Sequence, residues 1–406
     1  MKEKILIICY RRPYPLNTGA EVRMFQHIEI LSEFYDIDVA YVSENEHEND
    51  YLNEICNNVI VIHKNKIKEY FRAVLFYMFC NMPLQIGQSY YKELNNWVIK
   101  HYKQYKFIMC EHIKTAPYIM NLSQTSKKDF LFFDGTDAVS LYLYNTCKLS
   151  KGIKKLVYGL EYKRMLKYEK KVYETIKNTI LISERDKSYI INNVKAICNP
   201  ATIFNYAIDL GYKPIVDEVK YSISFIGRMD YAPNVAAVTY FVERIYGNIK
   251  QKITDVSFHI LGGHVCDSIK KFDGNNGIVV HGFVNDAAYY LQRSTVVIAP
   301  MRSGAGLQNK IIQAMYLGCT IITSELGADG LADLVGNEIV IYRDDADFIN
   351  KLLFLLSDQA ADYRKKIGQR AREYINRIYS YSAIRKQIID LFSFYDQKII
   401  GESGNV

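Results

Sequence analysis

Short apolar runs alternate with amphipathic segments along the first half of the chain. The runs that we predict as β-strands are residues 4–9, 37–42, 59–63, 107–110, 130–133 and 179–182. Helices are expected at 22–34, after the first strand, and at 116–123, after the fourth. This alternation is typical of parallel βαβ units, in which a helix connects one strand to the next.

A second series of the same kind follows. Its predicted strands are 222–226, 256–261, 278–280, 296–299 and 320–322, with helices that include 235–246 and 307–317. Between the two series, residues 196–219 contain Pro200, Gly211 and Pro214 and are the expected linker. The pattern predicts two consecutive doubly wound α/β domains, with ligands at the carboxyl ends of the strands. A last helix is expected at 383–395, without an indication of where it packs.

Composition indicates an ordered globular protein. The chain has 406 residues, 49% hydrophobic and 23% charged, which suits two domains of ordinary size. Its longest apolar run, Ala73–Cys80, is too short to span a bilayer, and the N-terminus reads as a strand rather than a signal peptide. The eight cysteines form no C-x-x-C pair, so we expect free thiols and a cytoplasmic location.

Positive charge is concentrated in one segment. The net charge is +7, and Lys148–Lys177 holds ten Lys or Arg residues against three Asp or Glu, interleaved with apolar side chains. Such a helix either lies on an anionic membrane surface or presents an ordinary solvated basic face. No nucleic-acid-binding motif accompanies the charge, so nucleic acid is not an expected partner.

The segment Pro300–Cys319, PMRSGAGLQNKIIQAMYLGC, has the pattern of an anion-binding loop. Small residues at Ser303–Gly306 leave backbone N–H groups accessible, and a helix is expected from near Leu307. Lys310 in its first turn is unfavourable by a few tenths of a kcal/mol unless an anion binds there. The alternative interpretation is a solvent-exposed lysine after a flexible loop.

Three further glycine-containing turns follow predicted strands. Gly227–Arg228 closes one strand, and arginine suits bidentate phosphate oxygens. Gly262–Gly263 is interpreted mainly as a tight turn, with contact to a ligand as the second interpretation. Gly19 either lets backbone N–H groups face an anion or serves a helix-capping turn. None of these turns is a P-loop or a G-x-G-x-x-G sequence, which argues against a P-loop nucleotidase and a dinucleotide dehydrogenase.

Acidic and histidine side chains also follow predicted strands. Asp137 either orients an acceptor hydroxyl or caps the next helix, whereas Ser183–Asp186 has the pattern of a capping box. His112 follows the strand at 107–110, where a lone histidine is more often structural than functional. No His, Cys or Asp cluster has metal-ligand spacing, and no G-x-S-x-G sequence supports hydrolase chemistry.

Taken together, the motifs resemble a known family. The chain is similar to GT-B glycosyltransferases of family 4, also called glycosyl transferases group 1, in the style of bacterial surface-polysaccharide enzymes. The matching motifs, in order over nearly the whole chain, are PYPLNTGAEVRMFQHIEIL, DGTDAVS, LISERD, FIGRMDYAPNVAAVTYF, VHGFVND and APMRSGAGLQNKIIQAMYLGCTIITSELGADGL. The resemblance implies two Rossmann-like domains facing a cleft. The expected acceptor domain is 1–200, the donor domain 201–380, and 381–406 a helical segment that returns to the first domain.

The resemblance also implies roles for individual residues. Arg228 and Lys310 would hold the donor diphosphate, His112 would contact the transferred sugar, and Asp137 is a further catalytic candidate. Phe283 and Val284 would lie by the nucleobase, and Gln313 by the ribose. The full set of expected donor contacts is Gly19, Gly227, Arg228, Gly263, Phe283, Val284, Gly304, Ala305, Gly306, Leu307, Lys310 and Gln313.

Some positions depart from the family pattern. A pair of glutamates eight positions apart is replaced here by Ala305 and Gln313, and Gln313 can bond ribose hydroxyls only through an uncharged amide. A lysine that commonly follows the Gly-Arg segment is absent, and Asn234 lies in that region. The linker signature is degenerate at Tyr206–Asp209.

The expected activity is retaining, metal-independent transfer of a hexose-type sugar from a UDP- or GDP-sugar to a glycan or lipid-linked acceptor. The resemblance implies surface polysaccharide or glycoconjugate assembly, and together with the basic segment it implies a location in the cytoplasm or at the inner face of the plasma membrane. Two alternatives stay open. One is a catalytically impaired GT-B subunit that supports a partner transferase, and the other is a nucleotide-sugar epimerase.

Overall fold

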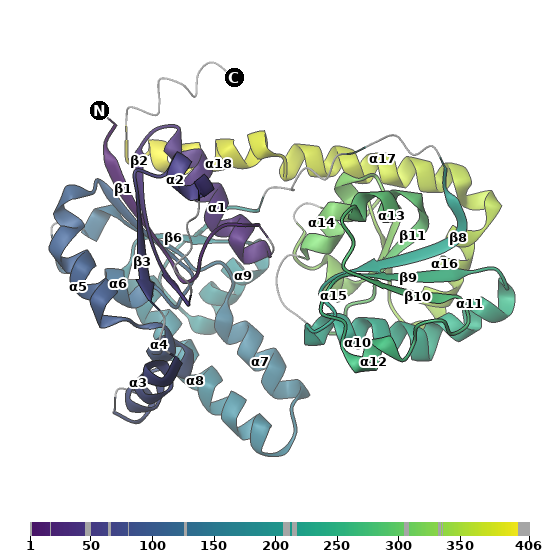
Figure 1. Cartoon of the computed structure of the whole chain (residues 1–406), viewed down its shortest axis with the longest axis horizontal. Helices are drawn as coiled ribbons and strands as arrows, with labels where there is room; N and C mark the ends of the chain where they lie inside the picture. Colours follow the sequence, from purple (N-terminus) through teal and green to yellow (C-terminus); the bar gives the residue numbers. More distant parts are fainter. Residues whose placement is uncertain are drawn as a thin grey trace. The chain divides into compact units, whose positions relative to one another are not determined.

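The computed structural model divides the chain into two compact units (Figure 1). It describes residues 2–396 except 17, 45–49, 64–65, 80, 126–127, 206–211, 213–216, 304–307, 332–333 and 335. One unit comprises Met1–Tyr206 with Ile384–Val406, and the other Ala207–Ala383. The division after Tyr206 falls a few residues beyond the predicted boundary at 200.

The first unit contains a seven-stranded, wholly parallel sheet in its described residues, in the order β3-β2-β1-β4-β5-β6-β7. Its strands are β1 Lys4–Cys9, β2 Asp36–Ser43, β3 Asn58–His63, β4 Phe107–Glu111, β5 Leu131–Asp134, β6 Asn178–Leu181 and β7 Ala201–Thr202. Its α-helices are α1 Gly19–Ser32, α2 Asp50–Ile55, α3 Lys66–Phe79, α4 Leu84–Ser89, α5 Lys92–His101, α6 Ala116–Met120, α7 Val139–Leu149, α8 Gly152–Thr175 and α9 Glu184–Tyr189.

Apolar runs without alternation explain why these segments form central strands. In β1, every residue from Ile5 to Cys9 is buried, because helices cover both faces of a parallel sheet. Each predicted strand is present within a few residues of its expected bounds. The short β7 lies inside the predicted linker and was not predicted.

The C-terminal helix α18, Tyr381–Ser393, contributes to the core of the first unit. The ring of Phe392 stacks on that of Phe132, with centroids 4.5 Å apart. Beyond the helix, Asp396 accepts hydrogen bonds from Tyr35 Oη at 2.7 Å and Lys106 Nζ at 2.5 Å. Aromatic stacking and a part-buried ion pair therefore fix the end of the described chain to β4 and β5.

The second unit has a six-stranded parallel sheet in its described residues, in the order β10-β9-β8-β11-β12-β13. Its strands are β8 Val219–Ile226, β9 Ser257–Leu261, β10 Ile278–Gly282, β11 Ser294–Ala299, β12 Ile321–Ser324 and β13 Val340–Tyr342, of which β13 was not predicted. Its α-helices are α10 Ala232–Tyr240, α11 Gly247–Lys252, α12 Asp267–Lys270, α13 Ala287–Arg293, α14 Asn309–Tyr316, α15 Glu325–Ala328, α16 Asp345–Leu356 and α17 Ala361–Ile378.

Short non-α helical segments complete the two units. They are η1 Tyr102–Gln104, η2 Lys128–Phe130, η3 Ile190–Val194, η4 Phe241–Tyr246 and η5 Asp358–Ala360. Within the described part of the chain, no helix combines the length and apolar character needed to cross a bilayer.

Each sheet has a topological switch point, where consecutive connections leave in opposite directions. In the first unit it lies between β1 and β4, and in the second between β8 and β11. In open α/β sheets, ligands bind beyond the carboxyl ends of the strands at this point. A ligand site is therefore expected at each of the two switch points.

Candidate functional site

The two predicted diphosphate-binding cations follow the two strands at the switch point of the second unit. Arg228 comes two residues after the end of β8, and Lys310 is the second residue of α14, which follows β11. Because β8 and β11 are adjacent and parallel, their carboxyl ends lie at the same edge of the sheet. The topology thus brings both cations to one edge.

A close approach of two glycines fixes the backbone around Arg228. The Gly227 N–H donates to the Leu261 carbonyl at 3.0 Å, and Gly262 has a φ of +136°. A Cβ on Gly262 would overlap the Gly227 carbonyl oxygen, so only glycine fits. The side-chain amide of Asn234 donates to the Arg228 carbonyl at 3.0 Å. Asn234, which stands in the region of the family's lysine, therefore supports the turn.

The side chain of Arg228 pairs with a neighbouring carboxylate. Its Nη2 lies 2.6 Å from Asp230 Oδ2, and its Nε lies 3.1 Å from Oδ1. Both side chains are more than a third exposed. The guanidinium is thus accessible to an anionic ligand that would compete with Asp230 or join it.

Lys310 lies in a much less polar environment. Its Nζ donates to Gln308 Oε1 at 3.0 Å, and it lies 3.8 Å from Met301 Sδ and 5.8 Å from the centroid of the Phe225 ring. Among the described residues it forms no ion pair with a carboxylate. Burial lowers the pKa of Lys310 to about 8. A part-buried ammonium without a carboxylate partner among the described residues is stabilised by a bound anion, which favours the ligand-binding interpretation over the exposed lysine.

The other expected donor contacts are only partly described. Phe283, which follows β10, is 77% exposed, and its Cβ would lie 3.7 Å from a Cβ placed on Gly263 after β9. Val284 is half-buried beside it, and Gln313 lies half-buried on α14. Gly304, Ala305, Gly306 and Leu307 lie outside the described residues, as do Tyr206–Asp209. An exposed aromatic ring at this edge is suited to stacking on a nucleobase.

At the switch point of the first unit, His112 follows β4 in a left-handed backbone conformation, with a φ of +74°. Its Nδ1 accepts a hydrogen bond from the Lys114 N–H at 3.3 Å, which places the ring proton on Nε2. Burial lowers the pKa of His112, and the charges of Lys114 and Arg11 lower it further. The ring lies 4.6 Å from that of Tyr10 and is a neutral hydrogen-bond donor through Nε2.

The capping interpretation of Asp137 does not hold. Helix α7 begins after Ala138, whose N–H donates to Asp186 Oδ1 at 3.0 Å, and no side chain caps the helix. Burial and the nearby carboxylate of Asp186 raise the pKa of Asp137. Ser183 is confirmed as the N-cap of α9, since its Oγ accepts from the Asp186 N–H at 3.1 Å; the Asp186 carboxylate bonds to Ser183 Oγ and to the Ala138 N–H.

Gly19 is the first residue of α1, and the turn before it has capping contacts. Glu21 Oε2 accepts from the Thr18 N–H at 2.7 Å, as the capping interpretation requires. The Gly19 carbonyl accepts from the Asn205 side-chain amide at 3.1 Å, which connects this turn to the segment after β7. A contact of Gly19 with a diphosphate remains a prediction.

A buried charge network beneath this edge was not predicted. Arg23 pairs with Asp134 at 2.6 Å, and His27 Nδ1 lies 2.7 Å from Glu111 Oε1, all four side chains being buried. Burial raises the pKa of Glu111 and lowers that of His27. His27, Glu111 and Asp134 have ligand atoms within 4.8 Å of one another, a spacing open to a metal ion. Arg23 already balances the charge of Asp134, however, and the prediction of no metal stays a prediction.

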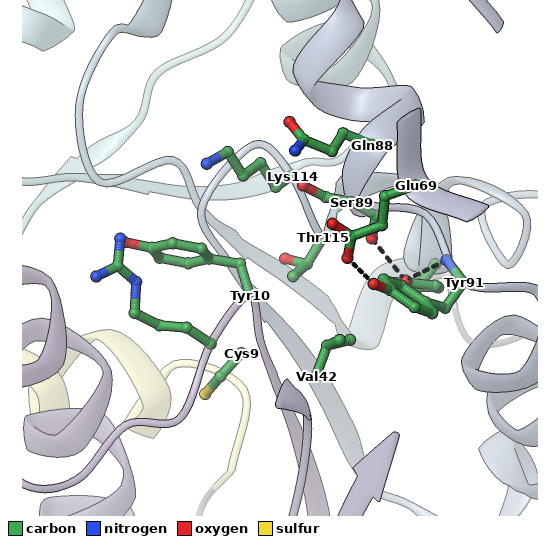
Figure 2. Close-up of a pocket in the computed structure, with 11 residues that line it drawn as sticks. Cys9, Tyr10, Val42, Glu69, Gln88, Ser89, Tyr91, Lys114 and Thr115 are labelled. Atoms are coloured by element: carbon green, nitrogen blue, oxygen red, sulfur yellow. Dashed lines mark hydrogen bonds between the residues drawn. The ribbon is translucent and has the colours of Figure 1, made fainter. Parts of the chain in front are cut away.

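The cavity in Figure 2 adjoins the same switch point. It has a volume of about 350 Å³ and is bounded by the ends of β1 and β2, the loop after β4, and helices α3 and α4. Its lining residues are Cys9, Tyr10, Arg11, Val42, Glu69, Gln88, Ser89, Tyr91, Lys114, Thr115 and Tyr118. Glycine and motif patterns did not indicate it, because the lining comes from five separate segments.

Comparisons with known proteins agree with this architecture. Residues 220–358 match the family model for glycosyl transferases group 1. A protein of 44.6 kDa in the cps region of Klebsiella pneumoniae is 23% identical over 372 residues, which cover 86% of this chain and 90% of that protein.

Solved structures share the fold over almost the whole chain. Sucrose-phosphate synthase from Thermosynechococcus elongatus has a TM-score of 0.71 at 16% identity and covers 98% of this chain and 100% of its own. Anabaena HepE in complex with UDP-glucose has a TM-score of 0.62 at 14% identity, covering 96% and 99%. Residues 220–358, within the second unit, therefore match the glycosyl transferases group 1 family, and the chain as a whole has the GT-B fold of these solved structures, with two parallel α/β units.

Proposed function

We propose that this protein transfers a hexose-type sugar, with retention, from a UDP-sugar to a glycan or lipid-linked acceptor in polysaccharide assembly. The observation that carries the proposal is Lys310, a part-buried ammonium at the switch point without a carboxylate partner among the described residues. The UDP and UDP-glucose bound to HepE support a UDP-sugar donor over a GDP-sugar. The cps-region relative supports a role in polysaccharide assembly.

The positions of the two cations suggest how the reaction is promoted. Cleavage of the anomeric bond places negative charge on the departing diphosphate and positive charge on the sugar ring. Fixed donors that face the diphosphate stabilise this transition state more than the ground state. Arg228 supplies a bidentate fork and Lys310 a point charge of low hydration, so the two side chains provide positive charge without a metal ion.

The first unit would supply the acceptor side. The neutral His112 ring can donate a hydrogen bond from Nε2 to a sugar hydroxyl or carbonyl group. Asp137, whose pKa is raised, would lie on the same side and orient an acceptor hydroxyl. In a retaining reaction without a dedicated base, an oxygen of the departing phosphate accepts the proton of the attacking hydroxyl.

We further propose that α8 binds an anionic membrane surface. Ile153, Leu156, Val157 and Leu160 form an apolar stripe with the spacing of one helix face, and each is at least 42% exposed. The exposed lysines Lys151, Lys154 and Lys155 surround its amino-terminal end. Apolar burial combined with lysines matches the chemistry of an interface of anionic lipids. Figure 1 shows α7 and α8 extending beyond the body of the first unit.

The donor assignment is tested by turnover of purified variants at saturating UDP-sugar. Arg228→Ala and Lys310→Ala should each slow transfer or donor hydrolysis by roughly a hundredfold. Lys220→Ala is the matched control, because Lys220 lies in the same unit in an exposed pair with Asp358. Near-normal turnover of both site variants would refute the donor assignment. Transfer by the purified chain excludes an inactive scaffold, and a product formed without acceptor would indicate an epimerase.

The membrane assignment is tested by flotation with vesicles of phosphatidylglycerol and phosphatidylcholine. The protein should float with anionic vesicles at low salt and less at high salt. Leu156→Asp should reduce flotation, whereas Val279→Asp, an exposed apolar residue on β10, should not. Equal recovery with neutral vesicles, or no flotation at all, would remove this assignment.

A further inference from the structure

We propose that the cavity at the ends of β1 and β4 binds an anionic group of the acceptor, held by Arg11 and Lys114. This inference rests on the proposed function, because it makes the cavity the acceptor site of the transferase. It adds the chemical class of the acceptor, namely a sugar that carries a carboxylate or a phosphate.

The cavity has the size and place of a sugar subsite. Its volume of about 350 Å³ accommodates a sugar ring with its substituents, and it opens at the switch point between β1 and β4. Figure 2 shows Tyr10, Lys114, Gln88 and Thr115 arranged around it. Aromatic and polar side chains of this kind stack on sugar rings and bond hydroxyl groups.

Two positive charges meet at one aromatic ring in this cavity. The Arg11 guanidinium carbon lies 4.6 Å from the centroid of the Tyr10 ring, and Lys114 Nζ lies 5.1 Å from the same centroid. An anion bound against this ring would be attracted by both charges. Arg11 is exposed and forms no ion pair with a carboxylate among the described residues. The guanidinium fork therefore suits bidentate contact with a ligand oxyanion.

The carboxylate in the cavity wall does not occupy this position. Glu69 is 2% exposed and accepts a hydrogen bond from the Tyr91 hydroxyl. In Figure 2 the Lys114 side chain extends away from Glu69, toward the side of Tyr10. The two cations of the cavity thus lie by Tyr10, whereas its buried carboxylate lies by Tyr91.

The two cations lie beside the expected reaction centre. The Tyr10 ring, which both cations contact, also lies 4.6 Å from the His112 ring. Lys114 is two residues from His112, and its N–H donates to His112 Nδ1. An anionic substituent held there would therefore place its sugar next to the histidine that we assign to the transferred sugar.

Ligand-observed NMR at saturating UDP tests the inference. The probes are methyl β-D-glucuronide for a carboxylate, glucose 1-phosphate for a phosphate, and methyl β-D-glucoside as the uncharged control. Saturating UDP blocks the donor site, so any signal reports a separate site. The charged probes should bind about tenfold or more tightly than the glucoside, since hydrogen bonds to charged groups are the stronger ones.

Variants decide whether Arg11 and Lys114 are responsible. Arg11→Gln and Lys114→Gln should each remove about tenfold of the preference for the charged probe. Arg11→Lys should restore part of it, and Lys103→Gln, exposed on η1 of the same unit, should leave it unchanged. Whichever charged probe binds more tightly identifies the source of the anion.

The possible failures are distinguishable. Equal binding of all three probes, or a preference that survives both Gln variants, would overturn the inference and leave the transferase assignment intact. A failure of the protein to bind UDP in a separate titration would instead contradict the proposed function. In that case the probe affinities would be measured without UDP, and the same Arg11 and Lys114 variants would test the preference for charged probes.

Discussion

The side chains of Arg228 and Asp230 form a bidentate ion pair, with Nη2–Oδ2 at 2.6 Å and Nε–Oδ1 at 3.1 Å. The hydrogen bond from Arg228 lowers the pKa of the Asp230 carboxyl. Because both side chains are exposed, the pair adds little to the stability of the fold. Its consequence concerns binding: without a ligand, the cation that we assign to the diphosphate is already neutralised by its own neighbour.

Asp230→Asn should therefore bind UDP more tightly than the native protein. Because an exposed ion pair is weak, the gain should be small, roughly twofold to fivefold in Kd. Isothermal titration calorimetry measures it directly. Asp358→Asn, which removes the partner of Lys220, is the control and should not change the Kd. Weaker binding by Asp230→Asn would mean that Asp230 itself contacts the ligand favourably.

The lowered pKa of Lys310, about 8, predicts a pH dependence of UDP binding. The diphosphate favours the charged ammonium, so above pH 8 binding must be accompanied by uptake of a proton. The Kd should rise by up to tenfold per pH unit between about pH 8 and pH 10. Below pH 8 the affinity should be nearly constant, apart from protonation of the diphosphate itself.

Lys310→Arg distinguishes deprotonation of Lys310 from other causes of a pH-dependent Kd, because a guanidinium stays charged throughout this pH range. Its Kd should be flat above pH 8, even if its geometry is poorer. The stability of the unliganded native protein has the opposite trend. Between about pH 8 and the unfolded lysine pKa near 10.4, the unfolded chain binds the extra proton, so stability rises with pH. A UDP affinity that is independent of pH in the native protein would place Lys310 away from the diphosphate.

Gly262→Ala should destabilise the second unit strongly. The residue has a φ of +136°, and the added Cβ would overlap the Gly227 carbonyl oxygen. We expect a loss of about 3 kcal/mol or more in the free energy of unfolding, measured with urea. Gly274→Ala is a matched control, because Gly274 has a φ of +74° with nothing within 4 Å of the new Cβ. It should lose only about 1 kcal/mol; equal losses would argue against close packing of the Gly227 turn.

Two substitutions of His112 distinguish the role of its side chain in catalysis from the requirement of its backbone conformation for stability. Asparagine tolerates the left-handed conformation, so His112→Asn should keep the fold while kcat falls by about tenfold to a hundredfold. UDP affinity should be unchanged, because His112 belongs to the other unit. His112→Val should in addition lower the stability by about 1–3 kcal/mol, since a β-branched residue is strained at this φ. Unchanged kcat in the folded His112→Asn variant would assign a purely structural role.

Local signals were sufficient for most of the strands. Central strands of parallel sheets are continuous apolar runs, and β1, β4 and β11 are of this kind. The missed strands have weaker signals: β7 is two residues long, and β13 is three. The N-cap at Ser183 was predictable because its contact with the Asp186 N–H lies within one turn of helix. For Asp137 the capping expectation does not hold, because no side chain caps α7 and the Ala138 N–H donates to Asp186 Oδ1, on another segment.

The sequence by itself determined the order of strands and helices, the two α/β series, the family motifs, and Arg228 and Lys310 as candidate cations. These features depend on residues close together in the chain, where periodicity, glycine positions and helix ends leave a readable pattern. Only the tertiary structure decided that Arg228 pairs with Asp230, that Lys310 is desolvated, and that Arg11 and Lys114 share the Tyr10 ring. The buried network of Arg23, His27, Glu111 and Asp134 belongs to the same class. Burial and charge proximity arise when strand order brings distant segments together, and no local pattern encodes that order.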